Sequence, residues 1–483
     1  MQKNKNSFPY ATAQKYYNYQ RNRHIFKKND GKAIDAIIRL LKVLKLSDRT
    51  LGLHTRCNAI YKTADKLLTL MLFPIFGVKN PANYAQSTLA DIAHGKKDLF
   101  YRMLNSKTIN WRNVNYKMFG KLYNKIKAEG EQDGPTCLIV DVTELKKRGY
   151  KIEFIGKVFS HVSNIHTLGF KLLSLCYDDG KQLLNFDCSL HGEMGKNGKQ
   201  GLTDKQLRSR KQEEHSEENA DYERIQEYFG SKTKALFGML RRFSQRGHKA
   251  DYLLADSWFT SIELIRLVRK LKGIGHYLGL TKLNDTKYTV SGKQVTAKQL
   301  SRKKSKRRIC YQLGITFIEV SALFQDVPVK LFISGREVAE NWRVMLTTDL
   351  SLSFEQAYRI YARRWNIEVF FKECKQHLNF GKCQSQKFNA QMAATTISLM
   401  QYNILATVKR FESYETFGEL FRAARIGVAE ATVTQRMWHI IKELGVKISK
   451  DFNLEEDFII EKYLNDKEVL RKLIDLETLH FVA

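Results

Sequence analysis

The chain has 483 residues, of which 43% are hydrophobic and 11% aromatic, so it can bury cores, and wholesale disorder is excluded. At roughly 150 residues per domain, this length predicts about three structural units. Lysine and arginine outnumber acidic residues by 81 to 50, and the resulting net charge of +31 favours a polyanionic partner. Composition alone leaves nucleic acid and an acidic membrane surface both open as that partner.

Two cellular locations are disfavoured by the apolar pattern and the cysteines. The N-terminal segment lacks the apolar core of a signal peptide. The longest apolar run, Leu67 to Val78, contains Pro74 and is shorter than the roughly 20 residues of a membrane-spanning helix. Seven cysteines without paired C-x-x-C spacing predict reduced thiols rather than a disulfide framework or a zinc site. We therefore expect a cytosolic protein.

Residues 1–130 show helical patterning and few strand signals, and we interpret them as a helical DNA-binding region. Within them the sequence predicts two short helices, Thr88 to His94 and Lys97 to Leu104, with a turn at Gly95. A helix-turn-helix of this size would offer Lys96, Lys97 and Arg102 to a duplex. An ordinary helical hairpin with a solvated basic face explains the pattern equally well.

Residues 131–272 change to a mixed α/β texture. The apolar run "CLIVDVTEL" is followed by strand-like segments, by a polar tract from Gly192 to Glu218 that predicts a mobile loop, and by a predicted helix from Asp221 to Gln245. The segment "ADYLLADSWFTSIELIRLVRKL" then predicts a strand, a turn and a helix. Strands mixed with helices in this order indicate an α/β layer domain.

Residues 273–343 return to strand texture and form a predicted β-rich insertion. It contains the densest cationic cluster of the chain: Lys298, Arg302, Lys303, Lys304, Lys306, Arg307 and Arg308. A solvated loop is the usual explanation of such a run, but on an already basic chain we favour a phosphate-contacting arm. Residues 344–410 are predicted to be mainly helical, and residues 411–483 form a helical C-terminal region that carries no chemical signal.

The segment "YARRWNIEVFFKECKQHL" places four reactive side chains on one stripe of a predicted helix. At about 100° per residue, Tyr361, Arg364, Glu368 and Lys375 fall within a narrow sector. The neighbouring face is apolar and is formed by Ile367, Phe370, Cys374 and Leu378. Surface Glu–Lys pairs are common on helices, so this spacing alone does not establish a site.

Two further acids end apolar runs in the α/β region, Asp141 and Asp256. Together with Glu368 they could hold two divalent cations about 3.5–4 Å apart, and Mg²⁺ suits such oxygen ligands best. Clustered carboxylates repel one another and need cations or protons to coexist. Spacing leaves four other acids open as substitutes: Asp178, Asp179, Asp251 and Glu263.

At this point the sequence resembles a family. "YARRWNIEVFFKECK" fills every position of the Y-x2-R-x3-E-x6-K signature of insertion sequence 4 family transposases, and "IVDVT" and "LLADSWF" resemble that family's two Asp motifs in the expected order. The β-rich insertion before the Glu also resembles the family's arrangement. One departure is Val142, since many relatives carry a second acid directly after the first Asp.

The resemblance implies an RNase H-like catalytic core, a mixed sheet flanked by helices, interrupted by the β-rich insertion. It implies a catalytic, metal-binding triad of Asp141, Asp256 and Glu368 with two Mg²⁺ per active site, for which Mn²⁺ would substitute. The DNA-contacting residues that it implies are Tyr361, Arg364, Lys375 and, by stacking, Trp365. Trp342 is the candidate for holding a flipped base in a hairpin intermediate, although a core tryptophan is an equally good interpretation.

The sequence thus predicts a bacterial, nucleoid-associated transposase that binds the terminal inverted repeats of its own element on double-stranded DNA, cuts them and joins them to target DNA. Two ends must be brought together, so we expect a homodimer on DNA. Two alternatives stay open: a metal-dependent nuclease that cuts without joining, and a non-enzymatic DNA-binding protein descended from a transposase.

Overall fold

The fold was analysed in a computed structural model of the chain. It describes residues 32–93, 95–129, 132–160, 163–335, 342–412 and 414–429. The chain divides into two compact units. Unit 1 comprises residues 1–48, 55–101 and 412–483, and unit 2 comprises residues 49–54 and 102–411. The predicted C-terminal region 411–483 lies outside the described residues beyond 429, and the predicted N-terminal region does so before residue 32.

The regular elements in the described part of unit 1 are helices. Its helices are α2 (Lys32–Leu44), α4 (Thr63–Leu72), η2 (Pro81–Gln86), α5 (Thr88–Ile92) and the start of α6 (Lys97–Leu104). Its core contains a ring cluster in which the centroids of Tyr84 and Phe100 lie 4.7 Å apart and those of Phe73 and Phe100 lie 5.2 Å apart. The helices α5 and α6 confirm the two predicted short helices. His94, the predicted last residue of the first helix, lies outside the described residues.

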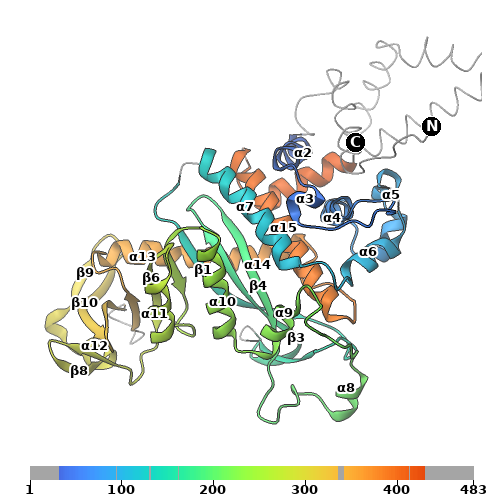
Figure 1. The fold of residues 1–483 in the computed structure, drawn as a ribbon. Helices are drawn as coiled ribbons and strands as arrows, with labels where there is room; N and C mark the ends of the chain where they lie inside the picture. Colours follow the sequence, from blue (N-terminus) through green and yellow to red (C-terminus); the bar gives the residue numbers. More distant parts are fainter. Residues whose placement is uncertain are drawn as a thin grey trace, which may run out of the picture. The chain divides into compact units, whose positions relative to one another are not determined.

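Unit 2 is built around one mixed sheet with helices, as the α/β prediction requires (Figure 1). The strands are β1 (Cys137–Lys146), β2 (Gly156–Ser160), β3 (Ile165–Asp178), β4 (Leu183–His191), β5 (Ala250–Ala255), β6 (Ile274–Thr281), β7 (Lys287–Val290), β8 (Lys293–Thr296), β9 (Arg308–Cys310), β10 (Ile315–Phe324), β11 (Val327–Gly335) and β12 (Arg343–Thr347). Their buried faces carry the apolar runs that predicted them, such as Cys137 to Val140 on β1.

The sheet order places β1 at the middle of the α/β part. The strands run β2-β3-β1-β5-β6-β12-β11-β10-β7-β8, with β4 paired to β3 and β9 to β10. β1, β5 and β6 are parallel neighbours, whereas β3 runs antiparallel to β1. The strands of the region 273–343 therefore continue this sheet through β6 and β12, and the boundary at 273 stays a prediction.

Unit 2 contains helices as well as the sheet, and several of them cover it. The helices are α7 (Trp111–Glu129), α8 (Asp204–Ser209), α9 (Tyr222–Phe229), α10 (Lys232–Gln245), α11 (Ile262–Lys270), α12 (Ala297–Ser301), η3 (Lys304–Lys306), α13 (Phe354–Ala362), η4 (Arg363–Trp365), α14 (Asn366–His377) and α15 (Phe388–Phe411). α7 and α15 lie side by side and pack on β4, while α14 packs on β1 and α11 on β6 (Figure 1).

Two predicted elements differ from the structure. The single helix predicted from Asp221 to Gln245 is two helices, α9 and α10, because the chain extends at Gly230 and Ser231 then caps α10 by accepting a hydrogen bond from the Lys234 amide. The tract predicted as a loop contains α8, which begins at a capping box formed by Thr203 and Gln206. Local capping residues decide both outcomes.

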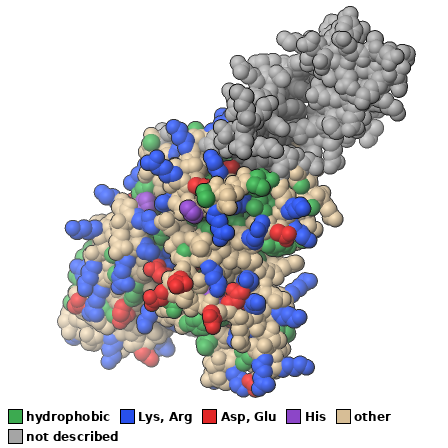
Figure 2. Space-filling model, turned by 45° about the vertical axis from the view of Figure 1, so that its right-hand side comes forward, with side chains coloured by type: hydrophobic (Ala, Val, Ile, Leu, Met, Phe, Trp, Pro, Cys, Tyr) green, Lys and Arg blue, Asp and Glu red, His purple; other side chains and the backbone are tan. Residues whose placement is uncertain are grey.

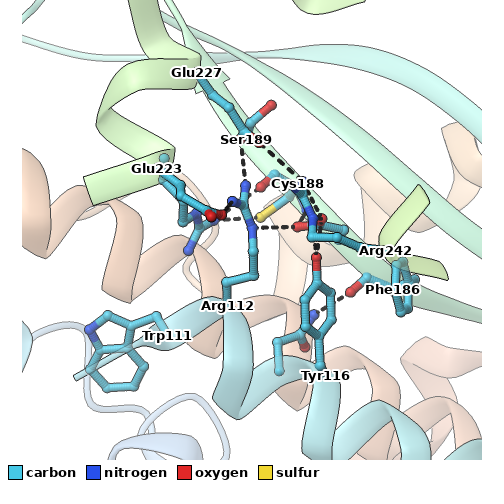
Figure 3. Close-up of polar contacts among 12 residues, drawn as sticks. Trp111, Arg112, Tyr116, Phe186, Cys188, Ser189, Glu223, Glu227 and Arg242 are labelled. Atoms are coloured by element: carbon cyan, nitrogen blue, oxygen red, sulfur yellow. Dashed lines mark hydrogen bonds and ion pairs between the residues drawn. The ribbon is translucent and has the colours of Figure 1, made fainter. Parts of the chain in front are cut away.

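A buried charge network ties α7, α9 and α10 to β4 (Figure 3). Asp187 accepts from the Arg112 Nε at 3.2 Å and from the Arg242 Nη2 at 3.0 Å, and the Tyr116 hydroxyl also donates to it. Glu227 pairs with both guanidiniums. Burial raises the pKa of Asp187, but the two guanidiniums and the hydroxyl outweigh that effect and hold the pKa below its ordinary value.

α15 has 24 residues, yet neither it nor any other helix of the described part combines the length and the apolar character that a bilayer crossing demands.

Candidate active site

The first two candidate acids lie where the parallel pairing of β1 and β5 ends. The last paired residues are Ile139 on β1 and Leu254 on β5. Asp141 follows Ile139 by two residues, and Asp256 follows Leu254 by two residues. Asp256 comes directly after β5, as predicted. Asp141 does not end its strand: β1 continues to Lys146 because it stays paired with β3, where Asp141 faces Ser174. Side-by-side parallel strands therefore bring the two acids to one edge of the pairing.

The signature segment is not one uninterrupted helix. Tyr361 lies on α13, Arg364 lies in the 3-10 turn η4, and Glu368 and Lys375 lie on α14. Asp178 fixes this break, since its carboxylate accepts from Arg363 Nε at 3.0 Å and from Asn366 Nδ2 at 2.7 Å. The predicted apolar face of α14 is confirmed, because Ile367, Phe370, Cys374 and Leu378 are all buried.

Arg364 connects two of the three candidate acids. Its Nη1 donates to Asp141 Oδ2 at 2.9 Å and its Nη2 donates to Glu368 Oε1 at 2.7 Å. The side chains are partly exposed, at 19% for Arg364 and Asp141 and 35% for Glu368. The four-residue spacing from Arg364 to Glu368 survives the break, so their predicted proximity holds. A single guanidinium thus neutralises charge between β1 and α14.

The three acids share one electrostatic environment. Burial raises the pKa of Asp141 to about 6, and the negative charges of Asp256 and Glu368 add to this, while the Val142 amide and Arg364 oppose it. The Val142 amide donates to Asp141 Oδ1 at 2.7 Å. The pKa of Asp141 therefore stays raised despite its ion pair, mainly because the carboxylate is buried.

The donor chemistry of these acids fits a hard divalent cation, since all three supply carboxylate oxygens. Burial raises the pKa of Asp141, and the charges of Asp256 and Glu368 add to this effect. As the side chains stand, however, no group of three metal-ligating side chains among the described residues is close enough to hold an ion. The Arg364 guanidinium lies between Asp141 and Glu368, so a cation that uses both must displace it.

The other signature residues surround the same edge. Lys375 donates from Nζ to Thr143 Oγ1 at 2.7 Å, two residues beyond Asp141, and burial lowers the pKa of Lys375. Burial raises the pKa of Tyr361 to about 12; Asp256 and Asp141 add to this, and Arg364 opposes it. Trp365 is 61% exposed, so its ring is accessible from solvent.

Trp342, the candidate for holding a flipped base, is half-buried in the structure. The Arg307 guanidinium lies over its ring at 5.0 Å from the centroid, and Gly335 packs so closely that a Cβ there would meet the indole at 3.1 Å. Both contacts occupy ring surface that a base would need. The described residues of the cationic cluster other than Arg307 and Lys304 are exposed: Lys298, Arg302, Lys303, Lys306 and Arg308.

Three of the four substitute acids have structural partners. Asp178 anchors η4 and α14, and Asp179 pairs with Arg410. Asp251 accepts from the amide and hydroxyl of Thr136 at 2.7 and 2.8 Å. Glu263 lies in the first turn of α11. Among the described acids, Asp256 and Glu368 are the ones whose negative charges raise the pKa of Asp141.

Two residues of this edge were given no role by the sequence pattern, Trp258 and Lys232. Trp258 lies inside the quoted "LLADSWF" motif and is 51% exposed, and the Lys232 Nζ lies 5.2 Å from its ring centroid. A position two residues after a candidate catalytic Asp is the signal that could have singled out Trp258. No sequence signal relates it to Lys232.

Comparison with known proteins gives three findings. Residues 231–404 match the family described as Transposase DDE domain, a span that includes Asp256 and Glu368 but not Asp141. No curated protein matches the chain. Among solved structures, a cryo-EM structure of the piggyBac transposase synaptic complex with hairpin DNA aligns with 85% of this chain and 82% of that chain, at 13% identity and a TM-score of 0.41.

Proposed function

We propose that this protein is a DNA transposase that binds the terminal inverted repeats of its own element, cuts the DNA there and joins the ends to target DNA. The observation that supports it most is the carboxylate edge: Asp141 and Glu368 share Arg364, and the charge of Asp256 acts on Asp141. The match of residues 231–404 to a transposase DDE domain supports the same assignment. Membership of the insertion sequence 4 family and an RNase H-like core with a β-rich insertion are part of this proposal.

In this proposal Asp141, Asp256 and Glu368 hold divalent cations, Mg²⁺ or Mn²⁺, as proteins of the DDE transposase family do. When bound, such cations would activate the attacking oxygen and stabilise the leaving oxygen of phosphoryl transfer. The chain's own contribution is position and charge, because phosphoryl transfer requires little covalent chemistry from a protein. The parallel strands β1 and β5 hold two of the acids, and the Asp178 contacts hold η4 and α14 for the third.

Arg364 has two partners available in this scheme. Without DNA it neutralises Asp141 and Glu368. A DNA phosphate offers the same guanidinium a bidentate anionic partner. Exchange of a carboxylate for a phosphate would free oxygens of Asp141 and Glu368, so Arg364 can couple the arrival of DNA to the opening of the acid cluster. Lys375 and Tyr361 extend this contact surface, with Lys375 as a second cation.

Further DNA contacts are proposed at the exposed cations of the 298–308 cluster and at the predicted helix-turn-helix. Lys96, Lys97 and Arg102 are each exposed. Figure 2 shows Lys and Arg side chains spread over the visible face rather than gathered in one strip. If these cations contact phosphates, affinity should fall with salt by a slope near −0.9 per neutralised phosphate. A homodimer on DNA would bring two ends together.

The test is an in vitro reaction with three possible products. Purified protein is incubated with Mg²⁺, a target plasmid and labelled duplexes that carry the two ends of the genomic segment around this gene. Joined products are the expected result. Cleavage without joining would indicate a nuclease instead, and binding without cleavage would indicate a DNA-binding protein that has lost activity. A scrambled duplex of equal length controls for sequence-independent cutting.

A further inference from the structure

The indole of Trp258 stands beside a candidate catalytic acid and is half exposed. Its main-chain amide donates to Asp256 Oδ1 at 3.0 Å, so one tight turn carries both the carboxylate and the ring. Single exposed aromatic residues are common on protein surfaces and by themselves imply nothing. Here the ring's position within two residues of Asp256 gives it a defined relation to the candidate site.

The turn after Asp256 is rigidly anchored on its inner side. The Phe259 side chain is only 3% exposed, its amide donates to the Asp256 carbonyl at 3.0 Å, and its ring meets Trp258 edge-on at 4.7 Å. Thr260 is fixed as well, with its hydroxyl 2.6 Å from that of Tyr277. Phe259 is buried while Trp258 is 51% exposed, so the turn directs the indole toward solvent and Phe259 packs against its edge.

Lys232 places a cation on the same ring. It lies at the start of α10, with its Nζ 5.2 Å from the Trp258 centroid and 3.8 Å from Glu193 Oε1. Glu193 is itself fixed, since it accepts from the Phe159 amide at 2.7 Å. With 51% of Trp258 exposed, the ammonium leaves much of the ring open. An open aromatic surface therefore lies next to a positioned ammonium group.

The indole and the ammonium together can bind the base and the phosphate of one nucleotide. An aromatic face stacks on a base without regard to sequence, and an adjacent ammonium attracts the phosphate of the same strand. Two residues of extended chain span at most about 7 Å, so a phosphate near Asp256 has a neighbouring base within reach of the indole. Trp342 offers less free surface, since Arg307 and Gly335 cover it.

We propose that Trp258 and Lys232 form a nucleotide-binding subsite at the edge of the acid cluster, in which the indole stacks on a base next to the cleaved phosphate and the ammonium contacts the strand. The subsite rests on the proposed function for the identity of its strand. Trp258 is a positioning residue here, since it holds the DNA end while the acids face the phosphate.

The experiment measures stacking separately from cutting. The probes are DNA duplexes that carry the two ends of the genomic segment around this gene. Each duplex has a free 3′ end and carries 2-aminopurine at one of its last three positions. Binding is measured in Ca²⁺. We expect the wild type to change 2-aminopurine fluorescence at one of these positions. Trp258→Ala should abolish that change and weaken binding by about 5- to 150-fold, the equivalent of roughly 1–3 kcal/mol. Trp258→Phe should restore most of both.

Two further variants sharpen the result. Lys232→Gln should lower the slope of log affinity against log salt by about one, as expected for one lost phosphate contact. Phe229→Ala is the matched control, because Phe229 is 60% exposed, lies on α9 and has no proposed DNA contact. It should leave the fluorescence change and the salt slope as in the wild type. Circular dichroism checks that every variant is folded.

The outcomes separate the subsite from the function. If the wild type cuts and joins DNA but Trp258→Ala shows the same fluorescence change and affinity, the subsite is wrong and the function stands. If the fluorescence change depends on Trp258 but the wild type neither cuts nor joins, the subsite stands and the function is wrong. A wild type that binds neither end overturns both.

Discussion

Two carboxylates of unit 2, Asp141 on β1 and Asp187 on β4, are both paired with arginine, yet their pKa values move in opposite directions. Asp187 is buried against Arg112 and Arg242, and its pKa lies below the ordinary value. Asp141 has one arginine, Arg364, and its pKa is raised to about 6. The difference is the local charge balance: cations surround the first acid, whereas two further acids act on the second.

This contrast separates an acid that holds the fold together from one that is poised for a ligand. A fully paired buried acid stabilises only when each partner is satisfied, as in the network of Figure 3. An acid whose pKa stays raised by burial and by neighbouring acids, despite its arginine, is incompletely stabilised in its charged form and can gain from a further cation.

The largest effect is expected on DNA cleavage. Asp141→Asn, Asp256→Asn and Glu368→Gln should each lower the cleavage rate by about four orders of magnitude, roughly 5.5 kcal/mol of transition-state stabilisation, because each removes a metal-binding oxygen. End binding should persist in a mobility-shift assay. Asp251→Asn, which alters an acid bonded to Thr136, serves as the control. A triad variant that cuts at the wild-type rate would exclude that residue from catalysis.

The next effect concerns stability at the other acid. Asp187→Asn leaves the guanidiniums of Arg112 and Arg242 without their shared carboxylate, so the free energy of unfolding should fall by about 3–5 kcal/mol in urea titrations. Asp326→Asn breaks the exposed pair with Arg266 and should leave the unfolding midpoint unchanged. Equal midpoints for the Asp187 and Asp326 variants would show that the buried network contributes no stability.

Asp141→Asn should raise the free energy of unfolding, whereas Asp187→Asn should lower it. The pKa of Asp141 is about 6 in the folded state and exceeds its ordinary value of 3.8. The charged carboxylate therefore destabilises the folded wild type, and this destabilisation grows as the pH rises from about 4 to 6. Without metal, the variant should therefore be more stable than the wild type at pH 8, by at most about 3 kcal/mol at 1.36 kcal/mol per pKa unit, and equally stable near pH 4. Urea unfolding in EDTA at both pH values measures this difference. A variant less stable than the wild type at pH 8 would contradict the raised pKa of Asp141.

The smallest effect concerns metal affinity without DNA. Because the Arg364 guanidinium already occupies Asp141 and Glu368, a cation must compete with it. Arg364→Ala should bind Mn²⁺ about tenfold more tightly, roughly 1.4 kcal/mol, in a titration followed by electron paramagnetic resonance. Arg359→Ala, which removes an exposed arginine paired with Glu355 on α13, is the matched control. Unchanged or weaker Mn²⁺ binding by Arg364→Ala would exclude the competition.

Short-range patterns predicted much of this protein. The apolar run before Asp141, the strand, turn and helix around Asp256, and the apolar face of α14 all appear as expected, because burial and period act within a few residues. The proximity of Arg364 and Glu368 could also be predicted from the sequence, because the two residues lie four positions apart. The split between α9 and α10 was missed because a local cap at Ser231 outweighed the apolar period.

The sequence by itself thus determined which residue types were available: three candidate acids, the signature residues and a strongly basic chain. Only the tertiary structure decided their relations. The parallel pairing of β1 with β5 brought Asp141 and Asp256 to one edge. Asp178, which is distant along the chain, accepts a hydrogen bond from Arg363 at the break between α13 and α14. Likewise Lys232 met Trp258, and Asp187 gained its two arginines. Contacts between distant segments depend on the packing of the whole sheet, which no local pattern encodes.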